Sequence, residues 1–412
     1  MKIAVIGGGV SGITSAFVLS QKHEVTLFES NDYIGGHTNT IPVTSGKSKV
    51  NIDTGFIVFN TPNYPNFTKL LDRLNVSSQK SEMTFGLYSP EDHFFYSSLD
   101  LFAQKKQLLS LSFYRMIFDI WRYHRLAYEA LESNNIDLIS IEDFLRLNNF
   151  SKPFIDHYLV PMGGAIWSCS YEAILKFPAK AFINFWKNHH MLQIKNRPVW
   201  RTVSQGSFQY VKAFEKTFKG SLLKNTAIKN VTRYKDHVEI VDSNGATHKM
   251  DAVVFAVHAN QVLPLLSDPT DKEAGLFSTW NYSKNSTILH TDSSLLPPKR
   301  KSWAAWNVCY NSQNSDQVGV TYYMNRLQNL DLETDYFVTL NQDQDIDPNH
   351  IIKTIKYSHP LFTFDSLASQ DKIKKLSGHN RTFYAGSYLG YGFHEDAVTS
   401  AVMVGNALGT HL

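Results

Sequence analysis

The sequence predicts an α/β protein whose main unit is a Rossmann-type dinucleotide-binding domain, discontinuous along the chain. Residues 2–28 read as a strand, a glycine loop, a helix and a second strand, which is the βαβ unit of such domains. Further apolar, strand-like runs occur at residues 252–256 and 382–385. Between these regions, residues 76–199 lack βαβ alternation and read mainly as helices. We therefore expect a second, interleaved α+β domain.

The opening unit carries a complete nucleotide-binding pattern. After the apolar run at residues 2–6, Gly7, Gly9 and Gly12 satisfy G-x-G-x-x-G, and the second strand ends just before Glu29. The first glycine permits a tight turn, the second lets the backbone approach a pyrophosphate, and the third lets helix and strand pack closely. The helix N-terminus attracts phosphate, and the carboxylate stands where it would bind an adenosine ribose. The pattern predicts dinucleotide binding, but it does not distinguish NAD from FAD.

The residues after the acid suggest a flavin. Gly35 and Gly36 follow Glu29 by six and seven positions, and Asp53 and Gly55 stand in a later NIDTGF run. This arrangement resembles the flavin-dependent amine oxidoreductase superfamily, which includes monoamine oxidases, protoporphyrinogen oxidases and phytoene desaturases. The resemblance implies FAD and a fold of the glutathione-reductase and amine-oxidase type. It also implies a domain division, with the FAD-binding domain at residues 1–75, 200–262 and 370–412, and the substrate domain at 76–199 and 263–369.

Two positions depart from that superfamily. His37 replaces the arginine that usually follows the paired glycines, so the fixed bidentate cation is missing. Asn285 or Ser286 occupies the place where amine oxidases keep a lysine, and Lys284 would lie on the other face of its strand. The run from Leu289 onward is similar to bacterial proteins known only as predicted NAD/FAD-binding proteins, associated with cyclopropane-fatty-acid synthases. The missing lysine argues against an amine oxidase.

The C-terminal GYGFHEDAV stretch contains three adjacent ionisable residues, which a metal site or a helix start would both explain. No second ligand cluster supports a metal, so we expect none. In the resembled superfamily a strand, a small-residue turn and a helix end the chain, and the first N–H groups of that helix face the flavin. We expect this helix at residues 395–408. His394 and Tyr391 are our candidates for acid/base catalysis, and Phe393 for a substrate-guiding aromatic.

The resemblance implies a set of cofactor contacts along the chain. We expect FAD to be bound non-covalently, because neither Cys169 nor Cys309 lies near the flavin loops. The expected cofactor-binding residues are Gly7, Gly9, Val10, Ser11, Gly12, Glu29, Ser30, Gly35, Gly36, His37, Thr38, Thr54, Gly55, Phe56, Val231, Gly386, Ser387, Phe393, His394 and Ala397.

Composition and charge limit the kinds of partner that we expect for the protein. A net charge of +3 and the absence of any long Lys/Arg run give no reason to expect nucleic acid. Without a leader or a run of about 18 apolar residues, we expect a cytoplasmic protein. Residues 108–131 form an aromatic-rich helical pattern with interspersed arginines. It either packs on the protein's own core or meets anionic lipid as a peripheral membrane contact. The sequence does not determine the oligomeric state.

Three functions fit these observations. The first is an FAD-dependent oxidoreductase that desaturates, dehydrogenates or isomerises an apolar substrate such as a fatty acyl chain, which suits the missing lysine and an aromatic content of 13%. The second is a flavin amine oxidase. The third is a flavoprotein without turnover that serves a lipid-modifying enzyme as a partner.

Overall fold

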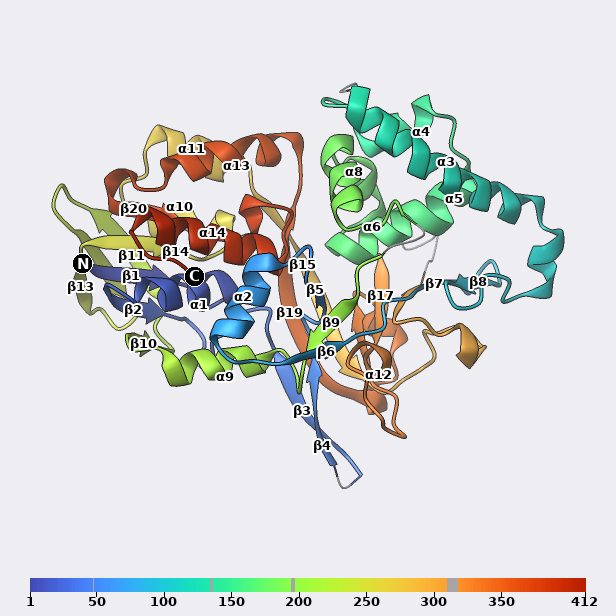
Figure 1. Cartoon of the computed structure of the whole chain (residues 1–412), viewed down its shortest axis with the longest axis horizontal. Helices are drawn as coiled ribbons and strands as arrows, with labels where there is room; N and C mark the ends of the chain where they lie inside the picture. Colours follow the sequence, from blue (N-terminus) through green and yellow to red (C-terminus); the bar gives the residue numbers. More distant parts are fainter. Residues whose placement is uncertain (47, 134–135, 194–196, 310–317) are drawn as a thin grey trace.

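A five-stranded parallel sheet forms one side of the molecule, which is a computed structural model describing residues 1–46, 48–133, 136–193, 197–309 and 318–412. The strand order is β10–β2–β1–β14–β20, and every neighbouring pair is parallel (Figure 1). The strands are β1 (Lys2–Ile6), β2 (Glu24–Phe28), β10 (Ser221–Leu223), β14 (Ala252–Phe255) and β20 (Thr382–Tyr384). Three separate stretches of the chain therefore build one sheet, and the α/β fold class is confirmed.

Both faces of this sheet are covered, which explains its nearly continuous apolar strands. Ile3 and Val5 of β1 face one core, where α1 (Val10–Leu19) packs against α14 (His394–Ala407). Ala4 and Ile6 face the opposite core. That second core includes residues of an antiparallel three-stranded sheet and of three helices: β11 (Ile228–Arg233), β12 (Val238–Asp242), β13 (Thr247–Met250), α10 (Ala259–Leu265), α11 (Asp271–Phe277) and α13 (Phe364–Leu376).

A second sheet of seven strands, in the order β19–β15–β18–β17–β16–β7–β8, lies beyond the parallel one (Figure 1). All its pairs are antiparallel except β16 with β7. Its strands are β7 (Phe85–Ser89), β8 (Phe94–Ser97), β15 (Asn281–His290), β16 (Trp306–Cys309), β17 (Gly319–Tyr323), β18 (Phe337–Leu340) and β19 (Ile351–Leu361). The long β15–β19 pair extends towards the parallel sheet, and it brings several polar side chains to the site described below.

A group of helices packs beside the second sheet (Figure 1). Its members are α3 (Leu111–Ser133), α4 (Ile141–Leu147), α5 (Lys152–Phe154), α6 (Val160–Trp167), α7 (Tyr171–Leu175) and α8 (Ala179–Asn188). The helix expected at 108–131 begins only at Leu111, because the backbone at Ser110 is extended and separates α3 from the short 3-10 helix η1 (Lys105–Leu109). One face of α3 is buried, through Phe113, Met116 and Tyr123.

Smaller elements connect these layers. They are β3 (Thr40–Ser45) and β4 (Ser48–Asp53), which form a projecting hairpin, the three-stranded sheet of β5 (Phe59–Asn60), β9 (Trp200–Val203) and β6 (Ser78–Lys80), and the helices α2 (Pro65–Arg73), α9 (Phe208–Thr217) and α12 (Met324–Leu327). Within the described ranges, none of the helices combines the length and the apolar character needed to cross a bilayer.

Candidate flavin site

The glycine loop after β1 has the geometry that its motif demands. Gly7 adopts a φ of +101°, which favours glycine. A Cβ on Gly12 would lie 1.8 Å from the carbonyl oxygen of Gly7, so the close packing of helix and loop excludes any side chain there. A Cβ on Gly9, in contrast, would meet no protein atom within 4 Å. Gly9 therefore borders open space, as expected of a backbone that a ligand approaches.

The N-terminus of α1 points into the same region. Its N-cap residue is Gly9, which offers no side-chain cap, and its first turn, from Val10 through Ser11, carries no acid. The first N–H groups of an α-helix have no internal acceptors and carry a partial positive charge. The start of α1 is thus an uncapped anion site beside the glycine loop.

Glu29 lies at the end of β2 and is 7% exposed. Its carboxylate accepts hydrogen bonds from the Gly8 N–H at 2.8 Å and from the Ser30 hydroxyl at 3.1 Å. The carbonyl oxygen of Glu29 accepts a bond from the N–H of Thr226. These bonds fix the acid beside the glycine loop.

Val231, expected to meet the adenine, has its carbonyl engaged within the fold. It is fully buried in β11, and its carbonyl accepts a hydrogen bond from the Ser267 N–H at 3.1 Å. The residue that the structure brings to Glu29 is Thr226, five positions earlier. A sequence match over a single strand could not determine which residue of this segment lies beside Glu29, because the β11–β12 pair contains an irregularity between Ile228 and Asn230.

Gly35 and Gly36 pack directly on the glycine loop. Gly35 forms a parallel bridge with Gly9, and its N–H donates to the Gly8 carbonyl at 2.8 Å. A Cβ on Gly36 would lie 3.3 Å from the Gly9 Cα. The paired glycines therefore line the same open space as Gly9.

His37 stands at the position of the superfamily's arginine, but its side chain packs among aromatic rings and does not act as a substitute for that cation. Its imidazole stacks on Tyr357 at 4.7 Å between ring centroids and lies 5.2 Å from His359. Burial, then the neighbouring histidines, holds the pKa of His37 well below its usual range. The ring bonds the backbone of Ser358, and Nε2 is buried without a partner. A neutral imidazole that donates to a carbonyl keeps its other nitrogen as an acceptor, which suits a hydroxyl group better than a phosphate oxygen.

Thr38, Thr54, Gly55 and Phe56 surround this group from the other side. The Thr54 hydroxyl donates to the Asn39 carbonyl at 2.8 Å and lies 3.1 Å from the Tyr357 hydroxyl. A Cβ on Gly55 would lie 2.1 Å from the His37 carbonyl oxygen, so the two loops are in close contact. The Thr38 hydroxyl points away from the loop, towards Tyr210 and His394.

The imidazole of His394 points into the protein interior. It stacks on Phe56 with centroids 3.6 Å apart, and Nε2 lies 3.0 Å from the Thr38 hydroxyl. Burial lowers the pKa of His394 to about 3, so the ring is neutral. This orientation argues against the acid/base role expected for His394. Its backbone N–H remains available, because His394 is the first residue of α14.

The two acids after His394 stabilise helix starts. The Asp396 carboxylate accepts the N–H groups of Phe393 at 2.9 Å and Tyr391 at 3.0 Å, at the beginning of its own helix. Glu395 accepts the N–H groups of Asn66 and Phe67, in the first turn of α2. Both carboxylates therefore act at helix starts. Ala397 is 3% exposed, and its N–H donates to the Phe393 carbonyl, which completes the first turn of α14.

The loop before α14 is tightly built. The N–H of Gly386 donates to the Ser400 hydroxyl at 2.9 Å. The carbonyl of Ser387 accepts the N–H groups of both Gly390 and Gly392. The loop is therefore held in shape by its own backbone, and it presents Tyr391 and Phe393 towards the helical layer.

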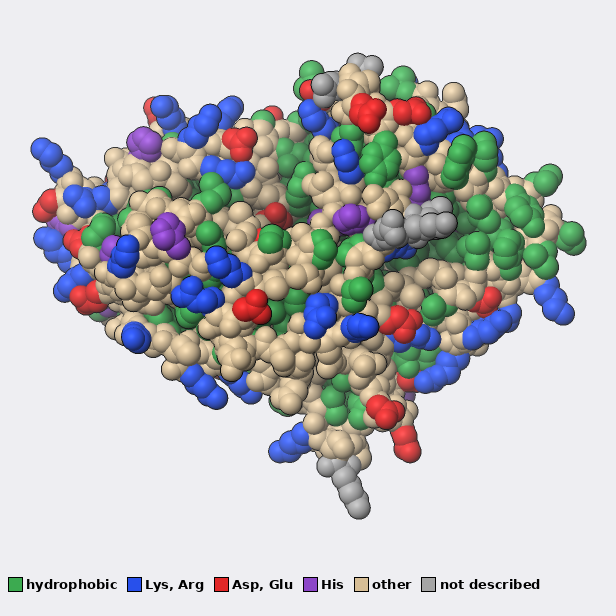
Figure 2. All heavy atoms as spheres, in the orientation of Figure 1, with side chains coloured by type: hydrophobic (Ala, Val, Ile, Leu, Met, Phe, Trp, Pro, Cys, Tyr) green, Lys and Arg blue, Asp and Glu red, His purple; other side chains and the backbone are tan. Residues whose placement is uncertain are grey.

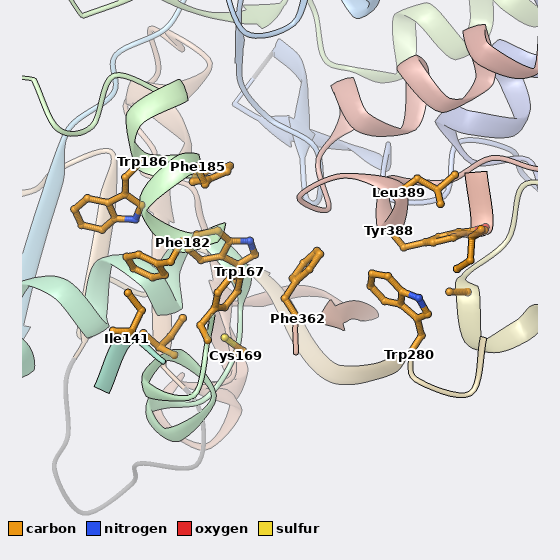
Figure 3. Close-up of a cluster of buried hydrophobic side chains, with 14 of the residues drawn as sticks. Ile141, Trp167, Cys169, Phe182, Phe185, Trp186, Trp280, Phe362, Tyr388 and Leu389 are labelled. Carbon is orange, nitrogen blue, oxygen red and sulfur yellow. The ribbon is translucent and has the colours of Figure 1, made fainter. Parts of the chain in front are cut away.

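An aromatic wall joins this loop to the helices. Phe393 stacks on Phe185 of α8 at 4.8 Å, and Tyr391 lies 5.7 Å from the same ring. Trp167, at the end of α6, is 4.8 Å from Phe185 and donates its indole N–H to the Tyr391 carbonyl at 3.3 Å. Figure 3 shows Phe362 between the rings of the helical layer and the pair Trp280 and Tyr388. Sequence reasoning missed Phe185, which lacks any motif.

The β15–β19 pair supplies the polar edge of the region. Asn285 is fully buried and donates to Nδ1 of His359 at 2.8 Å. Lys284, the neighbouring residue, is exposed on the other face of the strand. Among the described residues, no three His, Cys, Asp or Glu side chains are grouped closely enough to hold a metal ion.

Comparison with known proteins identifies the family of the chain. The family model for flavin containing amine oxidoreductases matches residues 10–329, so the chain belongs to that family. It is accordingly an oxidoreductase of the flavin-dependent type, and the predicted superfamily is confirmed.

Solved structures share the fold over nearly the whole chain. A putrescine oxidase bound to putrescine has a TM-score of 0.70 and 12% identity, covering 99% of both chains. A fatty acid isomerase from P. acnes that produces CLA has a TM-score of 0.68 and 16% identity, covering 97% of this chain and 96% of its own. A putative protoporphyrinogen oxidase from Exiguobacterium sp. 255-15 has a TM-score of 0.67 and 12% identity, covering 99% and 98%.

A curated relative matches a short stretch. The 4,4'-diapophytoene desaturase (4,4'-diaponeurosporene-forming) of Staphylococcus aureus strain Newman is 55% identical over 42 residues. That match covers 10% of this chain and 8% of the desaturase.

Proposed function

We propose that the protein is an FAD-dependent oxidoreductase that acts on an apolar substrate, a fatty acyl or related lipid chain. When bound, FAD would supply the hydride acceptor for desaturation, dehydrogenation or isomerisation. The observation that carries the proposal is the aromatic wall of Phe185, Tyr391, Phe393 and Trp167 beside the start of α14. These residues would align an apolar chain and keep water from the reacting carbon.

The chain offers a complete set of groups for non-covalent FAD. The start of α1 and the open space at Gly9 suit the pyrophosphate, and Glu29 suits the ribose. Thr226, whose N–H bonds to the Glu29 carbonyl, would lie on the side of the adenine. The first N–H groups of α14, beginning at His394, suit the polar edge of the isoalloxazine. The segments that supply these groups fall in residues 1–75, 200–262 and 370–412, which we propose as the FAD-binding domain.

The charges near the wall favour an uncharged substrate. Glu395 and Asp396 are the acids closest in sequence to Phe393, and both accept backbone N–H groups at helix starts. An ammonium group at the wall would therefore compete with these N–H groups for the carboxylate oxygens. Asn285 or Ser286, at the place where the resembled amine oxidases keep a lysine, offers no cation, and Asn285 bonds to His359 and Asn341. The desaturase and isomerase among the similar proteins act on apolar chains by their names, which supports the same reading.

The test is a comparison of substrates under anaerobic conditions. The purified protein would be mixed with unsaturated fatty acids, their acyl esters, putrescine and benzylamine. We expect loss of the visible flavin absorbance or a shifted double bond with a lipid, measured by spectrophotometry and by mass spectrometry of the product. Because isomerisation leaves no net reduction, the product analysis is needed even when the spectrum is unchanged. Bleaching by an amine, with no change in any lipid, would contradict the proposal.

An amine oxidase is the second candidate, favoured by the family and by Phe393. In the resembled amine oxidases, an aromatic at this position belongs to a cage that guides the amine. The bleaching experiment separates the two. A flavoprotein without turnover, acting as partner of a lipid-modifying enzyme, is the third candidate. It would bind FAD but change no substrate in either arm.

A further inference from the structure

A band of apolar side chains on the helical layer is open to solvent. We define the η1–α3 patch as Leu99, Leu101, Phe102, Leu108, Leu109, Leu111, Tyr114, Phe118 and Trp121, all exposed. Leu109 is 90% exposed and Leu111 is 86% exposed. Figure 2 shows hydrophobic side chains gathered at this rim of the molecule, over η1 and the first turns of α3. Scattered exposed leucines are ordinary in soluble proteins, whereas a contiguous group this large marks an interaction surface.

The patch is continuous in space. Phe102 lies 6.2 Å from Tyr114 between ring centroids, and the Tyr114 hydroxyl donates to the Leu108 carbonyl at 3.2 Å. One turn further along α3, Phe118 lies 6.1 Å from Trp121. Residues 111, 114, 118 and 121 share one face of the helix by their spacing.

This exposed face lies opposite a buried one. Phe113, Met116 and Tyr123 of α3 pack into the core, so the expectation that the helix lies on the protein's own core holds for that side. An ordinary surface helix would carry polar residues on its other side. The apolar residues there remain largely exposed, with Leu111 at 86%, Phe118 at 50% and Trp121 at 53%.

Basic side chains border the patch. Between Leu99 and Arg125 the chain has five basic residues and two acids. The basic residues are Lys105, Lys106, Arg115, Arg122 and Arg125. Arg125 lies 3.5 Å from Glu129, one turn further along α3. One of the acids, Asp119, is buried and paired with Arg115 and Arg122. The other, Asp100, lies 3.2 Å from Lys301, a further cation at this edge.

The arginines lie against the aromatic rings of the patch. Arg115 is 5.9 Å from the centre of the Phe118 ring, and Arg125 is 5.4 Å from that of Trp121. Their stems cover apolar surface while the charged ends stay at the level of the rings. Leucines that project, with Trp, Tyr and arginines beside them, have the composition of an interfacial membrane-binding surface.

We propose that the η1–α3 patch docks the protein onto the surface of an anionic lipid bilayer. The leucines and aromatic rings enter the boundary between headgroups and acyl chains, and the bordering cations meet the anionic headgroups. This attachment is peripheral, and it stands independently of the substrate proposed above. It would place the enzyme where apolar chains are stored.

The test is co-sedimentation of the full-length protein with vesicles of phosphatidylcholine, with and without phosphatidylglycerol. We expect binding to the anionic vesicles that weakens as salt is raised. The double variant Leu109→Ser/Leu111→Ser should bind at least about tenfold more weakly, since each leucine contributes apolar burial. Lys105→Gln/Lys106→Gln should lose much of the preference for phosphatidylglycerol.

Leu138→Ser/Leu147→Ser is the matched control. These leucines are 87% and 65% exposed and lie on the α4 side of the layer, outside the patch. This variant should bind vesicles as the unchanged protein does. Equal binding by the patch variant and the control, or no vesicle binding by the unchanged protein, would overturn the proposal. So would a dimer, seen by light scattering, that the patch variant disrupts while vesicle binding stays absent.

Discussion

Two helices begin at the candidate flavin site, and their first turns are built differently. α1 begins after Gly9 with no side-chain cap and no acid in its first turn. α14 begins after Phe393, likewise without a side-chain cap, but it has two acids in its first turn, and Asp396 accepts the N–H groups of Phe393 and Tyr391 just before the helix. Both ends present partial positive charge, but only the second carries its own carboxylate.

This difference assigns the helices to different ends of the proposed cofactor. A first turn without an acid adds no negative charge of its own and leaves its N–H groups to a strongly charged pyrophosphate. A terminus that already holds a carboxylate suits a group of lower negative charge, such as the polar edge of a flavin ring. The comparison also explains why three ionisable residues in a row, from His394 to Asp396, need no metal and no acid/base cluster. His394 packs on Phe56, and the two acids cap helices.

The largest expected effect is a difference between substitutions of two glycines at the start of α1. Gly12→Ala would place a Cβ 1.8 Å from the Gly7 carbonyl oxygen, so we expect a loss of stability of about 3 kcal/mol or failure to fold. Gly9→Ala meets no protein atom and keeps a φ of −71°, so stability should change by less than about 0.5 kcal/mol. Its flavin content should nevertheless fall sharply. Thermal unfolding without added cofactor and the flavin-to-protein ratio measure the two effects. If Gly9→Ala retains full flavin, the open space there is not the cofactor's.

The next largest effect concerns how the stability contributed by Asp396, in the first turn of α14, depends on pH. Burial raises the pKa of Asp396 from 3.8 to about 6, against the N–H bonds that lower it. The folded state therefore holds a proton more tightly than the unfolded state, and this group's contribution to stability falls as pH rises from about 4 to 6. Asp396→Asn keeps an accepting oxygen without the charge. Relative to the variant, the unchanged protein should lose on the order of 2 kcal/mol across that range, measured by denaturant unfolding. A stability difference that does not vary with pH would show that Asp396 titrates normally.

The smallest effect concerns His37, between the two helix starts. His37→Phe keeps the stacking on Tyr357 and removes the unpartnered Nε2. Loss of one neutral hydrogen bond should weaken FAD binding by roughly threefold to tenfold, measured by titration of the cofactor-free protein. His37→Gln, which retains an accepting oxygen, is the control and should lose less. Equal losses in both variants would mean that ring packing, not the nitrogen, matters.

The parts of the molecule that depend on neighbouring residues could be predicted from the sequence. The strand, glycines and helix at residues 2–19, the acid at Glu29 and the start of α14 all follow from local pattern. The orientation of the His394 ring could not be predicted, because Thr38, Phe56 and Tyr210, which set it, lie between 184 and 356 positions away in the sequence. The partners of Val231 depend on an irregular strand register, and Phe185 reaches the wall only through the packing of α8.

The most direct test of the account is the identity of the cofactor that the purified protein releases on denaturation. Mass spectrometry of the supernatant, with the absorption spectrum of the native protein, measures it. We expect flavin absorption and intact FAD, about one per chain, released without covalent attachment. Release of FMN, retention of flavin on the denatured chain, or NAD in place of a flavin would contradict the assignment of α1 and α14 to the two ends of one FAD.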